Sequence, residues 1–136
     1  MLLATAEIAE RLRVAGLRPT RQRLALAAIL FAAGDRHVSA EALHDEAVAA
    51  HVPVSLATVY NTLNQFTGAG LLREVAIEGN RGYFDTNTSN HFHYFLEDKG
   101  QLVDIGSEDV QVLGLPALPP GTVIDRIDVI VRLKRG

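Results

Sequence analysis

Two histidines two residues apart, His91 and His93, are the residues best placed to do chemistry in this chain. In a strand, residues two apart project from the same face, so both imidazoles could address one centre, as ligands of a divalent metal do. The spacing leaves a second interpretation open, in which both are structural histidines. His37, Asp85 and Asp104 could complete such a centre, although sequence spacing does not show that distant residues meet.

A second group of residues could read a nucleic acid. Segment 55–70, SLATVYNTLNQFTGAG, has helical spacing and places on one apolar stripe Leu56, Val59, Leu63 and Phe66. The opposite face is small or hydrogen-bonding and uncharged, with Ala57, Tyr60, Asn61 and Asn64. Small residues allow close approach to a groove, an aromatic ring can contact thymine methyls, and asparagine can pair with adenine. An ordinary amphipathic helix with a polar solvent side is the alternative.

Basic charge is concentrated upstream of this helix. Five arginines and no acidic residue lie between positions 11 and 23, whereas the whole chain has a formal net charge of -3. Arg18 stands at a break between two helical patterns, where Gly16 ends the first and Thr20 caps the second. An arginine on such a loop can reach phosphates or a narrow, A/T-rich minor groove. The arginine-rich loop and the neutral helix face together favour DNA binding over the alternative of a solvated helix junction. The candidate DNA-binding residues are Arg18, Thr20, Arg21, Arg23, Ser55, Ala57, Thr58, Tyr60, Asn61 and Asn64.

The elements that must position these residues follow a winged-helix order. Periodicity predicts helices at 5–15, 21–33, 40–50 and 55–70, then strands at 71–77 and 82–85 around a turn at 78–80. His37 falls in the loop before the third helix, and the apolar positions of the second helix are Leu24, Ala28, Ile29 and Phe31. Helices followed by a hairpin predict a winged helix-turn-helix DNA-binding domain over residues 1–86.

A second, smaller domain is predicted after a polar hinge at 87–90. It has strands at 91–96 and 101–105, a short helical or irregular piece at 108–113 and a last strand within 123–133, whose buried face is Ile127, Val129, Val131 and Leu133. So small a unit is not expected to be stable alone, and a second copy or a ligand would supply the missing burial. The predicted fold class is α+β, a winged helix-turn-helix domain followed by a small α/β dimerisation and ligand-sensing domain at 91–136.

Composition excludes several classes of protein. The 136 residues are 48% hydrophobic and 21% charged, as in globular proteins, and the absence of cysteine excludes disulfides, thiolate metal sites and cysteine nucleophiles. The first residues do not resemble a signal peptide, so we expect a cytoplasmic protein that does not enter a membrane. We find no nucleophile elbow, no phosphate-binding glycine loop and no HExxH motif, so we do not expect an enzyme. The alternative is a metal-dependent hydrolase using the HxH pair, which would still need a general base.

Taken together, the motifs resemble the ferric uptake regulator (Fur) superfamily of bacterial metal-responsive repressors. The resemblance covers nearly the whole chain and is carried by GLRPTRQRLALAAIL, RHVSAEALH, VSLATVYNTLNQFTGAGLLREV, GYFDT and HFHYFLEDKGQLVDI. Within the superfamily the chain is most similar to the iron response regulator (Irr) group of alpha-proteobacteria, through YFDTN, YFLE, LVDI and RIDVIVRL. The resemblance implies a homodimer that binds A/T-rich double-stranded operator DNA of iron and haem genes.

The resemblance also implies roles for individual residues. Tyr60 matches the tyrosine of the reading helix, and Arg18 matches the basic residue of the minor-groove loop. The metal site that bridges the two domains, for iron, manganese or zinc, maps onto His37, Asp85, His93 and Asp104, with His91 as a fifth candidate. The family's cysteine zinc site is absent, since Leu96 and Lys99 stand at its positions. Haem held by His91 and His93 is an alternative signal, and a haem-binding module without operator recognition is an alternative function.

Overall fold

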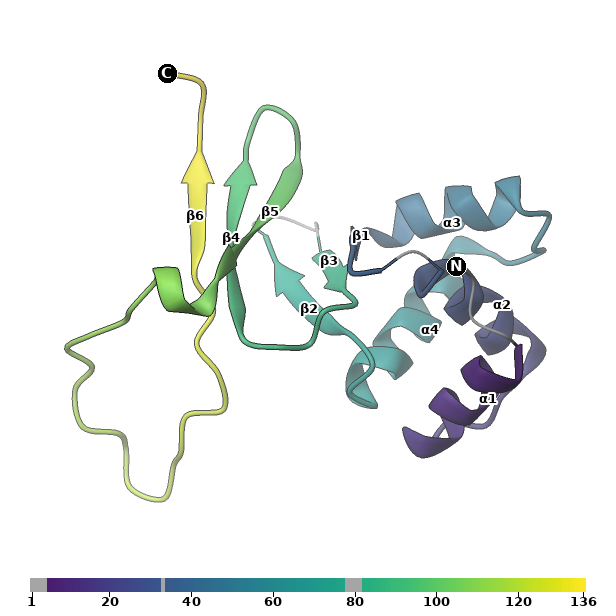
Figure 1. The fold of residues 1–136 in the computed structure, drawn as a ribbon, viewed down its shortest axis with the longest axis horizontal. Coiled ribbons are helices and arrows are strands. Elements are labelled where there is room, and N and C mark those ends of the chain that lie inside the picture. Colours follow the sequence, from purple (N-terminus) through teal and green to yellow (C-terminus); the bar gives the residue numbers. More distant parts are fainter. Residues whose placement is uncertain (1–4, 33, 78–81) are drawn as a thin grey trace. The chain divides into compact units, whose positions relative to one another are not determined.

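The computed structural model describes residues 5–32, 34–77 and 82–136, which form two compact units, Met1–Thr88 and Ser89–Gly136 (Figure 1). Helices dominate the first unit, and the second is built on strands. In the described part of the chain, no helix is long and apolar enough to cross a membrane.

The described residues of the first unit form α1 (Thr5–Val14), α2 (Arg21–Leu30), α3 (Ala40–Ala49) and α4 (Leu56–Gly68). The last three begin behind a hydroxyl that accepts a hydrogen bond from the backbone N–H three residues further on, and these N-caps are Thr20, Ser39 and Ser55. After α1, Gly16 has a φ of 84°, a left-handed conformation that glycine adopts without strain. The predicted starts of these helices are therefore confirmed, with the chemistry that the sequence indicated.

The helices share an apolar core that includes Leu12, Leu26, Leu43, Leu63 and Phe66. Two predicted details are wrong. α2 buries Leu26, Ala27 and Leu30, whereas Ala28 is exposed and Leu24, Ile29 and Phe31 are only partly buried. Most of the circumference of α2 is apolar, so its periodicity does not single out one face. In α4, Leu56 is 37% exposed because it occupies the first position of the helix, before the stripe reaches the core.

A three-stranded antiparallel sheet completes the first unit. Its strands are β1 (His37–Val38), β2 (Arg73–Ala76) and β3 (Gly82–Asp85), in the order β1-β3-β2. The hairpin pairing of β2 with β3 is as predicted, and the turn predicted at 78–80 lies outside the described residues. The expectation that His37 lies in a loop is wrong, because β1 pairs with β3 in a register that puts His37 opposite Asp85. Two residues are too few to show a strand pattern in the sequence.

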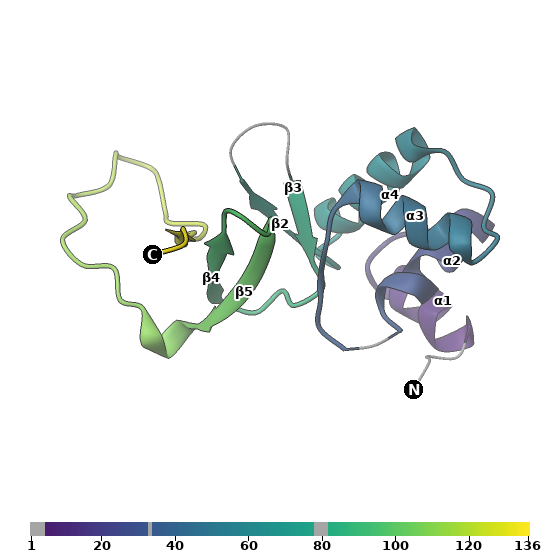
Figure 2. The same cartoon turned by 90° about the horizontal axis from the view of Figure 1, so that it is seen from above.

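The second unit is a sheet with the strand order β5-β4-β6. β4 (His91–Leu96) and β5 (Gln101–Gly106) form the predicted antiparallel hairpin, the 3-10 turn η1 (Ser107–Asp109) follows, and β6 (Ile130–Leu133) pairs parallel to β4. Between η1 and β6 the chain makes a wide excursion from the sheet (Figures 1 and 2).

The last strand differs from its prediction. It is four residues long, and the face expected to be buried is not covered within the chain, since Val131 is 38% exposed, Leu133 is 36% exposed, and Ile127 and Val129 are half-buried. The alternation of apolar and polar residues is real, but β6 is an edge strand. Within the described residues of this unit, no α-helix is present to cover its apolar face.

Candidate metal centre and nucleic-acid interface

The structure gathers the five predicted ligands into two groups, one in each unit. The first ligand group is His37 with Asp85, whose Nε2 and Oδ2 atoms are 3.3 Å apart across the β1–β3 pairing. Asp85 is 1% exposed, and its other oxygen, Oδ1, accepts a hydrogen bond of 2.9 Å from the backbone N–H of Asn87. A buried carboxylate requires compensating partners, and here one face of it is directed at an imidazole.

The residues that flank the first ligand group fix its geometry. The backbone N–H of Arg36 donates to Oγ1 of Thr86 at 2.9 Å, and the N–H of Thr86 donates to the carbonyl of Arg36 at 3.0 Å. The guanidinium of Arg36 also donates two hydrogen bonds to Glu46 in α3, at 2.9 and 2.6 Å, and these raise the pKa of Arg36. A bidentate pair of this kind is directional. Arg36 precedes His37 and Thr86 follows Asp85, so their bonds to each other keep His37 and Asp85 in register.

The second ligand group is His91, His93 and Asp104. Both histidines project from the buried face of β4, at 5% and 3% exposure, with ring centroids 4.6 Å apart. Asp104 lies opposite His93 in the β4–β5 register, and its Oδ1 is 3.5 Å from Nε2 of each histidine. The prediction that the two histidines share a face is confirmed. The hairpin adds a carboxylate directed at both rings.

The hydrogen bonding of His91 shows what this second ligand group requires. Its Nδ1 lies 2.7 Å from the carbonyl oxygen of Ser89, and a carbonyl only accepts, so Nδ1 carries the ring proton. The other ring nitrogen, Nε2, lies 3.5 Å from Oδ1 of Asp104, an oxygen that accepts hydrogen bonds and binds cations. A divalent metal ion accepts electron pairs from both an imidazole nitrogen and a carboxylate oxygen, so it suits this pair. A backbone carbonyl that fixes the tautomer is typical of metal-ligating histidines.

The donor set therefore fits a divalent transition metal. Two imidazole nitrogens and one carboxylate oxygen lie within 4.8 Å of one another in the second ligand group. The first ligand group has one imidazole and one carboxylate within its own unit. Mixed nitrogen and oxygen ligands of this kind suit iron(II), manganese(II) and zinc(II). The remaining histidines differ, since His44 bonds through Nε2 to the carbonyl of Val54 at 3.1 Å and His51 follows α3 on the surface.

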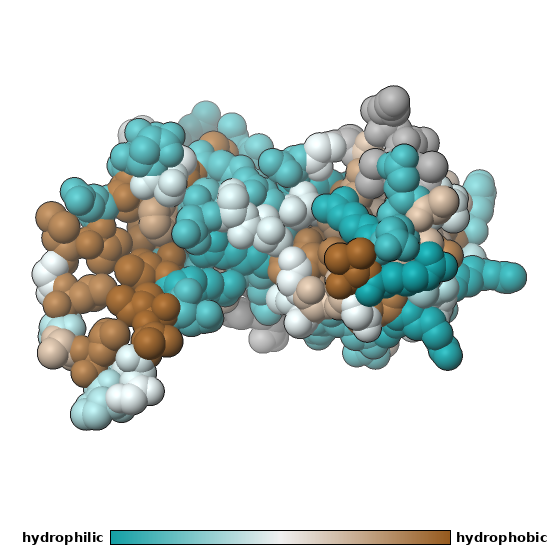
Figure 3. Space-filling model, turned by 60° about the horizontal axis from the view of Figure 1, so that its bottom comes forward, coloured by the Kyte–Doolittle hydropathy of each residue, from teal (hydrophilic) through white to brown (hydrophobic). Residues whose placement is uncertain are grey.

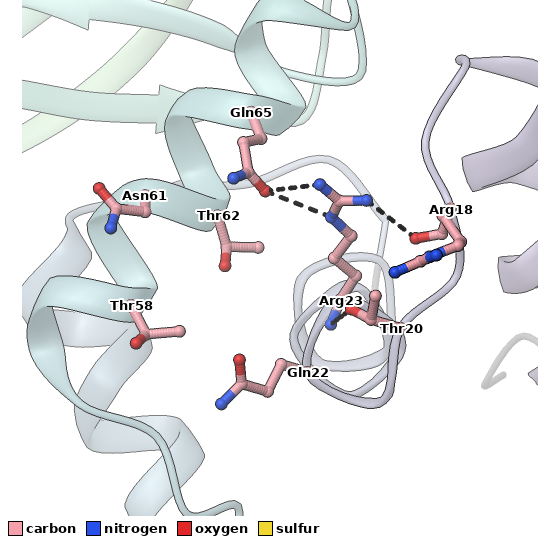
Figure 4. Close-up of a pocket in the computed structure, with 8 residues that line it drawn as sticks. All are labelled: Arg18, Thr20, Gln22, Arg23, Thr58, Asn61, Thr62 and Gln65. Carbon is pink, nitrogen blue, oxygen red and sulfur yellow. Dashed lines mark hydrogen bonds between the residues drawn. The ribbon is translucent and has the colours of Figure 1, made fainter.

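Half of the predicted DNA-binding residues line an open cavity of about 320 Å³ in the first unit (Figure 4). Five of them line it, namely Arg18, Thr20, Arg23, Thr58 and Asn61. Sequence reasoning missed the other lining residues, Gln22, Thr62 and Gln65. Gln65 could have been found, because it lies four positions after Asn61 and so on the same face of α4. Arg21, Ser55, Ala57 and Asn64 are exposed outside the cavity lining.

Tyr60 is more constrained than the sequence indicated. Its side chain packs partly against the core, and its hydroxyl donates a 2.7 Å hydrogen bond to Oε1 of Glu41 in α3. This bond raises the pKa of Tyr60 and lowers the pKa of Glu41. Sequence reasoning did not single out Glu41, because nothing local relates two residues on different helices.

A winged helix with an uncharged exposed helix face, an adjacent arginine-rich loop and histidine–carboxylate ligand groups defines a class, the metal-binding winged-helix regulators. The model of the ferric uptake regulator family matches residues 14–116. The chain belongs to the ferric uptake regulator family. It is therefore a metal-responsive transcriptional regulator and not an enzyme, which overturns the hydrolase alternative.

Individual relatives agree with this assignment. The ferric uptake regulation proteins of Escherichia coli K12 and Shigella flexneri are 33% and 34% identical over 101 residues, which are 74% of this chain and 68% of each relative. The ferric uptake regulator of Pseudomonas aeruginosa, solved with manganese, matches with a TM-score of 0.71 and 26% identity over 94% of this chain and 97% of its own. The ferric uptake regulator of Vibrio cholerae matches with a TM-score of 0.73 and 25% identity, over 93% of this chain and 98% of its own. These structures confirm the α+β fold class.

Proposed function

We propose that this chain regulates genes of iron and haem metabolism by binding operator DNA when a divalent metal occupies its histidine–aspartate ligands. The observation that carries the proposal is that Nε2 of both His91 and His93 lies 3.5 Å from Oδ1 of Asp104, while Nδ1 of His91 is bonded to a backbone carbonyl as in metal-ligating histidines. The iron or haem signal is supported by the sequence resemblance to the Irr group. Binding to chromosomal DNA would place the protein in the cytoplasm.

In this proposal the first and second ligand groups share one ion. Five residues, 86–90, separate Asp85 from His91, and a chain of that length spans at most about 22 Å when fully extended. A linker of that length permits Asp85 to reach the second ligand group. An ion bound by His37, Asp85, His91, His93 and Asp104 would fix that angle. Fixing the hinge selects one spacing of the reading helices, which is how metal would control DNA affinity.

The DNA-binding surface combines α4 with the Arg18 loop. The exposed, uncharged Ala57, Asn61 and Asn64, together with the ring of Tyr60, suit base edges in a major groove. Arg18 is exposed on the loop before α2 and suits an A/T-rich minor groove. The other proposed contacts would be to the phosphate backbone and comprise Thr20, Arg21, Arg23, Ser55 and Thr58.

A homodimer is proposed because the second unit leaves large apolar side chains uncovered. Leu113, Val123 and Ile124 are 76%, 88% and 49% exposed, and further members of this surface are Val103, Val112, Leu115, Leu118, Val131 and Leu133. Figure 3 shows apolar surface concentrated over the excursion that precedes β6. Extended apolar surface of this kind marks an interaction site. A second copy would cover it, and the resulting two-fold axis would match a pseudo-palindromic operator.

A metal ion fits the second ligand group better than haem does. The Nε2 atoms of His91 and His93 both lie 3.5 Å from Oδ1 of Asp104, so the three donors are close enough together for one small ion. Haem ligation needs the imidazoles on the two faces of a wide planar ring, or one of them exposed to it. Both histidines are buried instead. Haem therefore ranks behind a metal as the direct ligand, and a haem-binding module without operator recognition ranks last.

The test of the proposed function uses DNA chosen by the protein itself. Duplexes would be selected from a random-sequence pool by the Mn²⁺-loaded protein and then titrated with and without a chelator. We expect the selection to yield an A/T-rich inverted repeat. The affinity of the protein for this duplex should fall by at least an order of magnitude when the metal is removed. Equal binding to selected and scrambled duplexes, with and without metal, would contradict the proposal.

A further inference from the structure

Arg23 connects three elements of the first unit. Its Nε and Nη2 atoms donate hydrogen bonds of 3.2 and 3.0 Å to Oε1 of Gln65 in α4, and its Nη1 atom donates one of 3.0 Å to the backbone carbonyl of Arg18 (Figure 4). Gln65 lies 42 positions away along the sequence, and Arg18 lies five positions before Arg23 in the loop that precedes α2. One guanidinium therefore spans from the loop to the reading helix.

The geometry of these bonds orients the guanidinium of Arg23. A guanidinium is planar, and its N–H groups point in fixed directions, so partners on two edges fix its orientation. At its other end, Arg23 is anchored by its backbone N–H, which donates to Oγ1 of the N-cap Thr20 at 3.3 Å. Arg18 takes part through its carbonyl, which leaves its own side chain outside these three bonds and on the cavity lining.

We infer that Arg23 is a positioning residue that holds the Arg18 loop at a set distance from α4, so that minor-groove and major-groove contacts are made as one unit. This inference rests on the proposed DNA-binding function. Arg18 gains affinity from the minor groove only where its loop is held in reach while α4 lies in the major groove. Without the link through Gln65, the loop would have to be ordered at the moment of binding, which costs conformational entropy.

The competing interpretation is that Arg23 acts only as a phosphate contact. Three of the five guanidinium N–H groups are engaged with Gln65 and Arg18, which leaves two that could reach a phosphate. Changing Arg23 itself removes both roles at once. Changing Gln65 removes the link and keeps every positive charge, so it separates the two interpretations.

The experiment is a double-mutant cycle between Arg18 and Gln65, whose side chains share no bond among the three described. Arg18→Ala would be made in the wild type and in Gln65→Met, which keeps the length of the side chain and removes the acceptor. Gln22→Met is the matched control, because Gln22 lines the same cavity and takes no part in the three bonds. Affinity for the selected duplex and its salt dependence would be measured, with thermal melting to verify folding.

In the wild type and in Gln22→Met, we expect Arg18→Ala to weaken binding about tenfold and to lower the slope of log affinity against log salt by about 1. In Gln65→Met, the same change should cost less than about threefold, because the loop contact is already lost. Gln65→Glu, which restores an acceptor, should restore the coupling. Equal losses in Gln65→Met and wild type would overturn the inference while leaving the proposed function intact. A wild type that does not discriminate the selected duplex from its scramble would overturn both.

Discussion

The hydroxyl of Tyr60 donates a 2.7 Å hydrogen bond to Oε1 of Glu41, which joins the reading helix α4 to the first turn of α3. The residue that the sequence indicates as a base contact is thus fixed by the preceding helix. Because the hydroxyl is already engaged, the ring of Tyr60 is the part available to thymine methyls. The bond also places a carboxylate at the edge of a surface proposed to meet phosphates.

Replacing Tyr60 should separate the role of the ring from that of the hydroxyl. Tyr60→Ala is expected to weaken specific binding by about 1 to 3 kcal/mol, the scale of one good base contact. Tyr60→Phe keeps the ring and loses the link to Glu41, so its loss of specificity should be smaller. The ratio of affinities for the selected and scrambled duplexes measures both. An unchanged ratio in Tyr60→Ala would show that α4 is not the reading helix.

The bond between Tyr60 and Glu41 should also give a defined pH dependence. The lowered pKa of Glu41 means that the bond stabilises the fold above the usual pKa of glutamate and loses this effect as pH falls through the lowered value. The raised pKa of Tyr60 means that the bond stabilises the fold below the usual pKa of tyrosine and that this stabilisation is lost as pH rises through the raised value. The difference in Tm between wild type and Tyr60→Phe should therefore be largest near neutral pH. A difference that is unchanged at both extremes would argue against the bond.

The site was predictable where a local pattern carries it. The two-residue period of a strand places His91 and His93 on one face. The residue type and position of Thr20, Ser39 and Ser55 indicate where three helices begin. The pairing of His37 with Asp85 was not predictable from pattern, because it depends on a two-residue strand and a register between distant segments. Links between helices, such as Arg23 to Gln65, have no local signal either.

The buried face predicted for 123–133 failed for a different reason. Alternation shows that Val131 and Leu133 belong to an apolar face, and it does not show what covers that face. Within the described residues of the single chain, Val131 and Leu133 each keep more than a third of their surface exposed. The pattern is consistent with coverage by a second copy, which is a property of an assembly.

The proposed dimer makes a prediction about Val123, which is 88% exposed in the single chain. Val123→Glu should cost the monomer little and should disfavour a dimer by placing a charge in an apolar interface. Val14→Glu is the matched control, because Val14 is 80% exposed in the first unit. Sizing with light scattering should show dimers for wild type and control and monomers for Val123→Glu. A monomeric wild type at micromolar concentration would contradict the dimer.

Bound metal should stabilise the fold by mass action. An ion at 100 times its dissociation constant adds about 2.7 kcal/mol to the free energy of unfolding if it binds only the folded state. Chelation should therefore lower the Tm of the wild type and leave the Tm of His93→Ala unchanged. Calorimetry with and without a chelator checks both expectations. Equal sensitivity of the two proteins to the chelator would place the stabilising ion elsewhere.

Metal analysis of the purified protein and three histidine variants tests the central claim most directly. We expect one divalent ion per chain in the wild type and in the control His44→Ala, whose ring is bonded to a backbone carbonyl. The ion should be lost from His93→Ala and also from His37→Ala, because the two ligand groups are proposed to share it. Retention of the ion by His93→Ala would contradict the metal centre. Retention by His37→Ala alone would contradict its sharing between the two units.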